Sequence, residues 1–330
     1  MQKLNCFYNH PQVHLFAQNN ISDTTEGNAV HRYRLIGLPV LVVCLGSLPA
    51  HGAQNDQLPT DLVALPNGAV NVALYASQQS LSGPWMGGAK LRPGEGSTDL
   101  SVLRLNRHFS LGEGDKYTIA PVIVLSAVNA EVDRKLAPLP LKGLQASGMG
   151  DVRLGAAFWF HKDDTLREYA AVSAFVSLPT GDYDSARTIN PGENRTKIIL
   201  SAGWMQQLGR QWVLDLIPEV AIFGDNTRYQ TNRRLSQDTA YAMTGVLRYK
   251  STPTLHWYGS AQLNRGGGTQ VDGIQRVGGG APENTRLSVG TILFGSNNHM
   301  LQQRYSRDVQ IENGYRNQGE VGIRWSTVFN

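Results

Sequence analysis

Cysteine is almost absent from this chain. Only two of its 330 residues are cysteines, and both of them, Cys6 and Cys44, lie near the N-terminus. A chain that loses this N-terminal part on export keeps no thiol, which excludes disulfide bonds, cysteine nucleophiles and thiolate metal sites together. We therefore expect no thiolate metal site and no cysteine-based catalysis, and we predict no other metal site.

The chain also lacks an apolar run long enough to cross a membrane as a helix. Its longest run, Leu35 to Leu48, has 14 residues and contains Pro39, whereas a transmembrane helix needs about 20 residues. A helical membrane protein with several spans is thereby excluded. Arg32 and Arg34 precede the run and small residues follow it as far as Ala53, and this basic, apolar, small order predicts a signal peptide.

The predicted leader covers residues 1–53, which is long for a signal peptide because about 30 residues precede its basic region. Two explanations stay open: an unusually long leader, or translation that starts at Val30. In both cases we expect the mature protein to begin between His51 and Gln54. Residues 54–66 then form a short periplasmic N-terminal segment.

No charge of one sign dominates the chain. The 30 Lys and Arg residues nearly balance the 26 Asp and Glu residues, and no basic tract stands out as a nucleic-acid footprint. The glycine clusters at 266–268 and 278–280 lack the strand-then-helix context of a phosphate-binding loop. We therefore expect no nucleic-acid partner, no bound cofactor and no nucleotide-driven energy source.

What the sequence has in abundance is alternation of apolar and polar side chains, the period-two pattern of β-strands. It begins near Asn67 and continues to the end of the chain, interrupted by turn-forming residues. Between Gln211 and Gly224, for example, the even-numbered positions are apolar, whereas Asp215 and Glu219 occupy odd-numbered ones. A strand with this pattern has one apolar and one polar face.

Twelve such segments can be recognised, and the connections between them differ in length. Those after the odd-numbered segments are long, roughly 10 to 21 residues, and those after the even-numbered ones are short, as in transmembrane barrels. We predict an all-β fold, a transmembrane antiparallel up-and-down β-barrel of about 12 strands over residues 67–330, with an apolar outer belt and a polar lumen. The predicted strands lie near residues 67–77, 98–109, 116–127, 149–160, 168–178, 195–206, 211–223, 239–250, 254–264, 285–294, 299–308 and 318–329.

A soluble β-sandwich or lipocalin-like barrel is the alternative fold, because its strands also alternate. Such a protein has no reason to sort its loop lengths by strand parity. Aromatic residues at both ends of one apolar face, such as Tyr241 and Tyr249, are typical of lipid-facing strands. The final segment ends on Phe329, one residue before the C-terminus, which resembles the closing strand that the barrel-assembly machinery uses. We therefore expect the outer membrane of a Gram-negative cell, with outer-membrane lipid and this machinery as partners.

Five polar residues on three consecutive predicted strands are the candidate residues that line the lumen or pore. Asp215 and Glu219 lie on the seventh strand, Arg248 on the eighth, and His256 and Tyr258 on the ninth. They could act as a selectivity ring or as substrate contacts. Alternatively, they could form a structural salt-bridge network that rigidifies or plugs the lumen. Both interpretations require them to face inward.

Short motifs, each ordinary as turn or strand chemistry, follow one another along nearly the whole mature chain. They are LPNG at 65–68, GDVRLG at 150–155, LPTGDYD at 178–184, PGENR at 191–195, GW at 203–204 and WVLD at 212–215. In order and spacing they resemble the phenol-degradation (meta-pathway) outer-membrane transporter family. The resemblance implies an outer-membrane protein found beside aromatic-degradation genes, with a role in transport, and it brings no binding residues to carry over.

We predict a channel or transporter for the passive passage of small molecules, with aromatic or hydrophobic compounds among the substrates, and no catalytic site. A structural or adhesive surface barrel is the first alternative. The second is a membrane-embedded hydrolase, since His108 and Ser110 have the spacing of a His and a Ser on the outer face of one strand. A serine nucleophile also needs an orienting partner and oxyanion donors, for which the sequence gives no sign.

Overall fold

The computed structural model describes residues 58–90, 95–132, 144–187, 189–275, 279–296 and 298–329. The predicted leader at 1–53, with the candidate start at Val30, lies outside the described residues. In the described part of the chain, no helix is long and apolar enough to cross a membrane. The one short helical turn there, η1, covers Glu113–Asp115.

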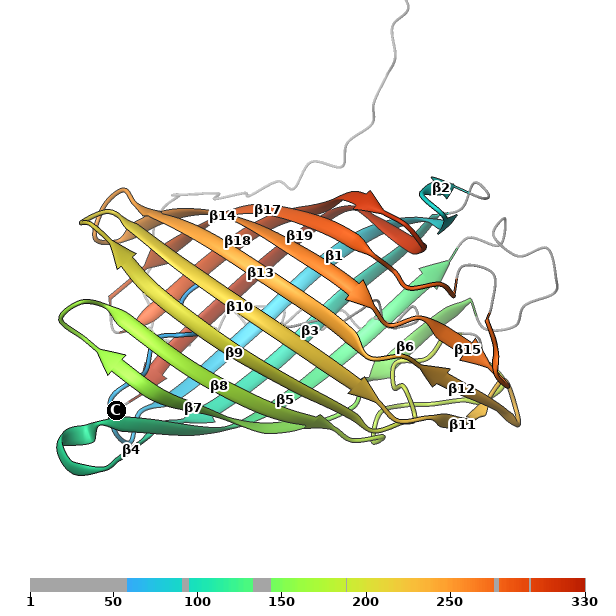
Figure 1. The fold of residues 1–330 in the computed structure, drawn as a ribbon, viewed down its shortest axis with the longest axis horizontal. Helices are drawn as coiled ribbons and strands as arrows, with labels where there is room; N and C mark the ends of the chain where they lie inside the picture. Colours follow the sequence, from blue (N-terminus) through green and yellow to red (C-terminus); the bar gives the residue numbers. More distant parts are fainter. Residues whose placement is uncertain are drawn as a thin grey trace, which may run out of the picture. The chain divides into compact units, whose positions relative to one another are not determined.

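Twelve antiparallel strands form a closed barrel (Figure 1), which confirms the predicted fold. The barrel closes where the first strand pairs with the last, with Val70 opposite Phe329. The strands follow one another around the barrel in chain order. They are β1 (Val70–Met86), β3 (Glu95–Arg107), β5 (Tyr117–Val132), β7 (Arg153–Asp163), β8 (Glu168–Ser177), β9 (Lys197–Leu208), β10 (Trp212–Phe223), β13 (Ala240–Lys250), β14 (Leu255–Gly266), β17 (Asn284–Phe294), β18 (His299–Ile311) and β19 (Gly314–Phe329).

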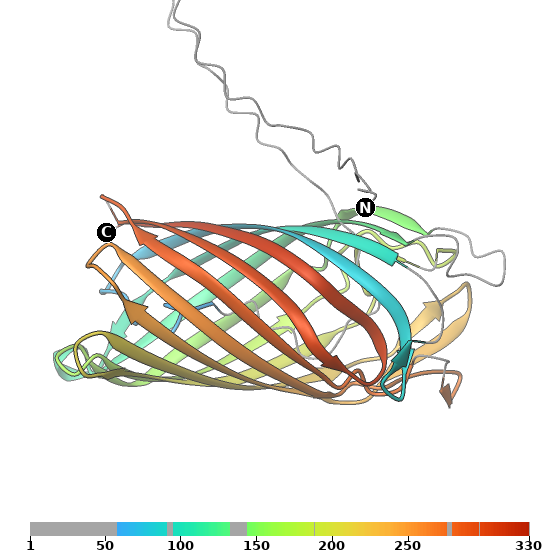
Figure 2. The ribbon, with the colours of Figure 1, turned by 90° about the horizontal axis from the view of Figure 1, so that it is seen from above.

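Shorter strands extend the barrel at its two ends. A separate four-stranded sheet lies at the end opposite the C-terminus (Figure 1). We call this the loop end, and the end that holds the start of β1 and the C-terminus the turn end (Figure 2). Strand β4 (Phe109–Leu111) lies at the turn end. The other short strands lie at the loop end: β2 (Ala89–Lys90), β6 (Gln145–Met149), and in the separate sheet β11 (Asn226–Tyr229), β12 (Arg233–Gln237), β15 (Thr269–Val271) and β16 (Ile274–Gln275).

Two predicted connections are shorter than expected. The sequence pattern placed long connections after the first and the eleventh strands, but only residues 87–94 separate β1 from β3, and β18 and β19 are joined by Glu312 and Asn313 alone. The strands continue past the point where apolar alternation fades, because polar residues there form hydrogen bonds inside the barrel. Asn317, for example, is fully buried, and its backbone N–H donates to the Asp308 carboxylate at 2.8 Å.

The burial pattern confirms which strand faces point outward. Along β10, Val213, Asp215 and Glu219 are buried, whereas Trp212 and Ile222 are exposed. Many other strands also present large apolar side chains on the outside. A soluble monomer rarely exposes so much contiguous apolar surface, and a lipid-facing belt requires it.

The lumen is not uniformly polar, contrary to the sequence-based expectation. Strand β5 is apolar on both faces, because residues such as Val122 and Val124 point inward while Ile123 faces out. Strand β3, which pairs with β5, and strands β8 and β9, which lie beyond β7, also bring apolar side chains to this wall, including Val102 and Ala171. Buried charged residues gather mainly on the opposite wall, formed by β10, β13, β14, β17, β18 and β19. The lumen therefore has one mainly apolar wall and one mainly charged wall.

Candidate functional site

Two cavities lie inside the barrel. The turn-end cavity has a volume of about 830 Å³, and its walls include Trp159, Met205 and Phe294. The loop-end cavity has a volume of about 290 Å³, and its walls include Gln79 and Gln262. These cavities are the candidate functional site of the chain.

Residues 58–66, which we call the luminal segment, lie between the cavities. Leu58 and Pro59 line the loop-end cavity, and the following residues, from Thr60 on, line the turn-end cavity. From Leu58 onward, the N-terminal segment therefore lies inside the barrel. It divides the space in the lumen before the chain enters β1.

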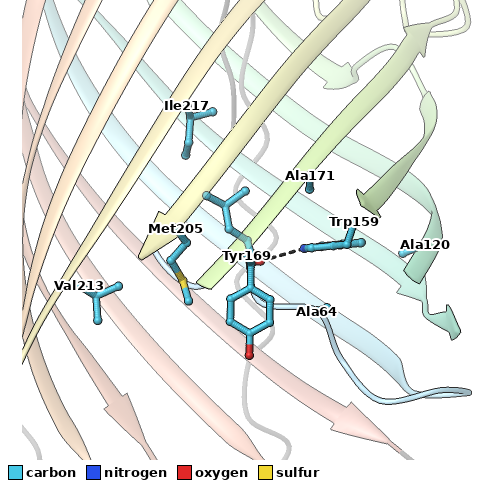
Figure 3. Packing of buried hydrophobic residues seen from close by; sticks show 9 residues of the cluster. Ala64, Ala120, Trp159, Tyr169, Ala171, Met205, Val213 and Ile217 are labelled. Atoms are coloured by element: carbon cyan, nitrogen blue, oxygen red, sulfur yellow. Dashed lines mark hydrogen bonds between the residues drawn. The ribbon is translucent and has the colours of Figure 1, made fainter. Parts of the chain in front are cut away.

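Strands of the apolar wall hold the luminal segment. Trp159 on β7 donates a hydrogen bond from Nε1 to the Leu62 carbonyl at 2.8 Å, the dashed line in Figure 3. The Leu62 side chain packs over Gly203 on β9, where an added Cβ would lie 2.1 Å from Leu62 Cδ2. The Leu65 N–H donates to Nδ1 of His108 at 3.3 Å. Glycine at position 203 is therefore part of the seat for this segment.

The single acidic residue of the luminal segment, Asp61, bridges two arginines from the barrel wall. Its carboxylate accepts from Arg324 Nη2 at 2.7 Å and from Arg104 Nη1 at 3.0 Å. Burial alone would raise the pKa of Asp61, but these two guanidinium groups hold it below its ordinary value. Asp61 is therefore ionised, and it fixes the segment to β3 and β19.

The structure brings four of the five predicted lumen residues close together at strand positions that face inward. Asp215, 1% exposed, accepts a hydrogen bond from Arg248 Nη2 at 3.0 Å. Tyr258 lies opposite Arg248 in the pairing of β13 with β14. Arg248 and His256 line the turn-end cavity, whereas Tyr258 lines the loop-end cavity. The ring of His256 lies 4.8 Å from that of Phe294.

Glu219 is buried further along β10 and lines neither of the two cavities described above.

Asp215 and Arg248 form a buried ion pair, as the structural interpretation of these residues required. At the same time, Arg248 and His256 contact the cavity, as the functional interpretation required. The geometry thus meets the structural requirements of both interpretations in one cluster.

Sequence reasoning missed a second network of charges, on the last three strands. Arg286 donates to Asp308 at 2.9 Å and lies 3.7 Å from Glu320, which also accepts from Arg304 at 2.5 Å. All four side chains point into the lumen at alternating strand positions. The alternation of apolar and polar residues could have shown that these side chains face inward. Asp308 and Glu320, however, lay near the ends of predicted strands, where the inward face is hardest to assign.

The motifs that carry the family resemblance converge at the loop end in what we call the loop node. Asp151 accepts hydrogen bonds from the N–H groups of Gly181 and Glu193, both at 2.9 Å. A Cβ on Gly181 would lie 2.7 Å from the backbone of Gly150, and a Cβ on Gly192 would lie 2.9 Å from Asp151 and from Gly181. The motifs at 150–155, 178–184 and 191–195 are therefore one packed unit rather than three separate turns.

Charge also fixes the loop node. Glu193 pairs with Arg195 and Lys197, each at 2.7 Å. Burial would raise the pKa of Glu193, but the two cations, Lys197 first, lower it well below its ordinary value. Since Asp151, Glu193 and Lys197 also line the loop-end cavity, the node forms part of the wall of that cavity.

The residues considered for a hydrolase do not form an outward-facing pair. His108 is buried and lines the turn-end cavity, and its ring lies 5.1 Å from that of Trp159. Its Nε2 is 2.8 Å from Asn106 Nδ2. Across the described ranges, no group of three or more His, Cys, Asp or Glu side chains is placed to hold a metal ion.

The chain is similar to known proteins both in sequence and in structure. The sequence model of the family described as "Putative MetA-pathway of phenol degradation" matches residues 83–323. Among solved structures, the chain is similar to an outer membrane channel from Pseudomonas putida F1, at 25% sequence identity and a TM-score of 0.77, over 83% of this chain and 100% of that one. No curated protein matches the chain.

Two further solved structures show a much looser likeness. The translocator domain of the autotransporter NalP from Neisseria meningitidis has 11% identity and a TM-score of 0.47, over 82% of this chain and 90% of that one. The P. putida toluene transporter TodX has 11% identity and a TM-score of 0.40, over 81% and 91%. Likeness at this level supports no argument about function.

Proposed function

Because the chain belongs to the family of the MetA pathway of phenol degradation, we propose that it is an outer-membrane channel through which small molecules, including aromatic or hydrophobic compounds, pass passively. The lumen carries this proposal: a closed barrel with an apolar outer face encloses two cavities. The similar structure from P. putida F1 is described as an outer membrane channel. The chain has no catalytic role in this proposal.

The proposal includes an orientation and a set of partners. Short turns face the periplasm in bacterial barrels, so the turn end lies there and the loop end lies outside the cell. Residues 1–53 are removed on export. The apolar outer face contacts outer-membrane lipid, and β19, which ends on Phe329, engages the barrel-assembly machinery.

A structural surface barrel is the second candidate, and the luminal segment favours it. This segment and the ion pairs of the charged wall lie inside the barrel, as a rigidifying network would. The two candidates differ in one measurable respect, because only a channel lets solutes cross the membrane through its lumen.

Solute flux into liposomes that contain the purified barrel tests the proposal. The flux of phenol, benzoate and sugars of similar size is compared with their flux into protein-free liposomes. Replacing Val122, which lines the turn-end cavity, by tryptophan should reduce the flux of aromatic compounds because the indole fills the cavity. Tryptophan at the neighbouring Ile123, on the other face of β5, is the matched control and should leave flux unchanged.

Two outcomes of this experiment would contradict the proposal. If the wild-type barrel inserts and folds but no solute crosses faster than through protein-free liposomes, the channel proposal fails and the structural barrel replaces it. If Val122→Trp and Ile123→Trp reduce flux equally, solutes do not use the turn-end cavity.

A further inference from the structure

Three charged side chains meet where the two cavities adjoin, and their charges do not balance. Arg104 and Arg324 both donate to Asp61, so two positive charges share one negative charge. Other carboxylates of the charged wall are engaged elsewhere, as in the pair of Asp215 with Arg248. Without any anion, these two buried arginines would carry unpaired charge at a high cost, so the site needs at least one carboxylate at all times.

Arg324 has hydrogen-bond donors that the chain does not use. Its side chain is 5% exposed, and Nη2 donates to Asp61. Its Nε and Nη1 have no hydrogen-bond partner in the part of the chain that the structure describes. The ring of Tyr75 lies 5.3 Å from the guanidinium carbon, and Arg324 lines both cavities. The planar donor edge of a guanidinium matches a carboxylate better than any other side chain does.

The turn-end cavity supplies the remaining features of a binding site. Its volume of about 830 Å³ falls in the usual range for small-molecule pockets. Trp159, Met205 and Phe294 provide apolar surface, whereas Arg248 and Lys250 add positive charge. Among the described residues that line this cavity, Asp61 is the only acid. The cavity therefore suits an apolar body that carries a negative charge.

Asp61 is placed so that another carboxylate could replace it. The preceding residue, Thr60, has a φ of 88°, a conformation that is strained for a β-branched side chain. Release of the luminal segment relieves this strain. A carboxylate from solution that takes over the two arginines leaves the net charge of the cluster unchanged, so the exchange has little electrostatic cost.

We propose that Arg104 and Arg324 bind the carboxylate of a small carboxylic acid with an apolar body, and that Asp61 occupies this site until the ligand displaces it. The inference rests on the proposed channel function and names a class of compound whose passage the lumen favours. The apolar body lies against Trp159 in the turn-end cavity. Displacement of Asp61 moves the luminal segment and joins the two cavities.

Flux measurements with two matched probes test the site. Benzoate and benzyl alcohol share an aromatic ring, but only benzoate carries a carboxylate. We expect benzoate flux through the wild-type barrel in liposomes to saturate, and benzyl alcohol flux to remain linear. Asp61→Asn should lower the half-saturating benzoate concentration by about tenfold, because the internal competitor is lost. Arg324→Gln should abolish saturation, whereas Arg304→Gln, a control at another lumen arginine, should retain it.

A binding measurement separates failure of the site from failure of the channel. Cyclohexanecarboxylate, which does not interfere with tryptophan emission, should shift the fluorescence of the wild-type barrel, because displacement of the segment breaks the hydrogen bond between Trp159 and Leu62. Trp159→Phe should lack this response. Heat-dependent gel migration of each variant shows whether it has folded.

Two outcomes overturn the inference. If aromatic compounds cross but benzoate flux never saturates and Asp61→Asn changes nothing, the channel stands and the site is wrong. If no compound crosses, the channel function fails, and absence of a Trp159-dependent response to cyclohexanecarboxylate overturns the site independently.

Discussion

Lowering the pH should release the luminal segment from the barrel wall, and His108 is the residue that makes it sensitive. The Leu65 N–H donates to Nδ1 of His108, and only an unprotonated nitrogen can accept this bond. Burial, followed by the positive charge of Arg104, lowers the pKa of His108 from 6.5 to about 4. The docked segment therefore favours the neutral imidazole.

The sign and size of the effect follow from this pKa. A histidine whose pKa is lowered in the docked state stabilises docking fully above pH 6.5, and this contribution is lost as the pH falls from 6.5 to about 4. At 1.36 kcal/mol for each pKa unit, the whole shift of His108 corresponds to about 3 kcal/mol, which sets the upper limit of its effect on docking at roughly a hundredfold change in the equilibrium. Asp61, whose pKa lies below its ordinary 3.8, keeps its charge throughout this range.

Conductance of the barrel in planar bilayers, measured between pH 7 and pH 4, checks the prediction. We expect wild-type conductance to rise as the pH falls, because the released segment opens the lumen. His108→Gln retains a hydrogen-bond acceptor that does not titrate, and its conductance should be flat over the same range. His256→Gln is the control for another histidine of the same cavity and should retain the rise. A wild-type conductance that does not change with pH would refute the reasoning.

Three further predictions concern stability. Asp215→Asn should destabilise the barrel by about 3 kcal/mol in denaturant unfolding from vesicles, because it leaves Arg248 buried without a counter-charge. The double variant Asp215→Asn with Arg248→Met should recover most of this stability. A double variant as unstable as Asp215→Asn would show that the loss does not come from the unpaired Arg248. Leu216→Arg should cost about 2 to 4 kcal/mol in the same assay, since it places a charge on the lipid face, and wild-type stability would show that this face is assigned wrongly. Gly181→Ala should loosen the loop node and expose it to proteolysis, because the added Cβ would lie 2.7 Å from the backbone of Gly150. Gly245→Ala is the control and should be neutral, since its Cβ would meet nothing closer than 3.7 Å. Equal proteolysis of the two variants would refute the close packing of the node.

The barrel could be predicted because its strands alternate between lipid and lumen. Strand β10 shows this most clearly: the inward position of Asp215 follows from the apolar residues on either side of it. Strand β5 shows where the argument reaches its limit, since Val122 and Ile123 are both apolar although they face opposite sides. Alternation identifies a lipid-facing side only when the lumen-facing side is polar, so the apolar wall could not be recognised from the pattern.

The luminal segment could not be predicted from periodicity, because it forms neither a strand nor a helix. Its position depends on contacts with residues far away in the sequence: Trp159 holds Leu62, and Arg324 holds Asp61. No local pattern reports such pairs. The one local sign was Asp61 itself, a single acid in a stretch of otherwise uncharged and mostly apolar residues between Leu58 and Pro66. A carboxylate in such surroundings requires a cationic partner.

The size of the barrel explains why a segment of the chain lies inside it. Barrels of about eight strands are filled by their own side chains, and those of 16 to 18 strands leave an aqueous channel. With twelve strands and small residues such as Ala120 and Ala171 on the apolar wall, space remains that the luminal segment partly fills. An apolar segment held by packing alone would respond to every solute in the same way. Because Asp61 is held by arginines, its release depends on the charge of the solute, and in our proposal this ion pair makes a plug selective.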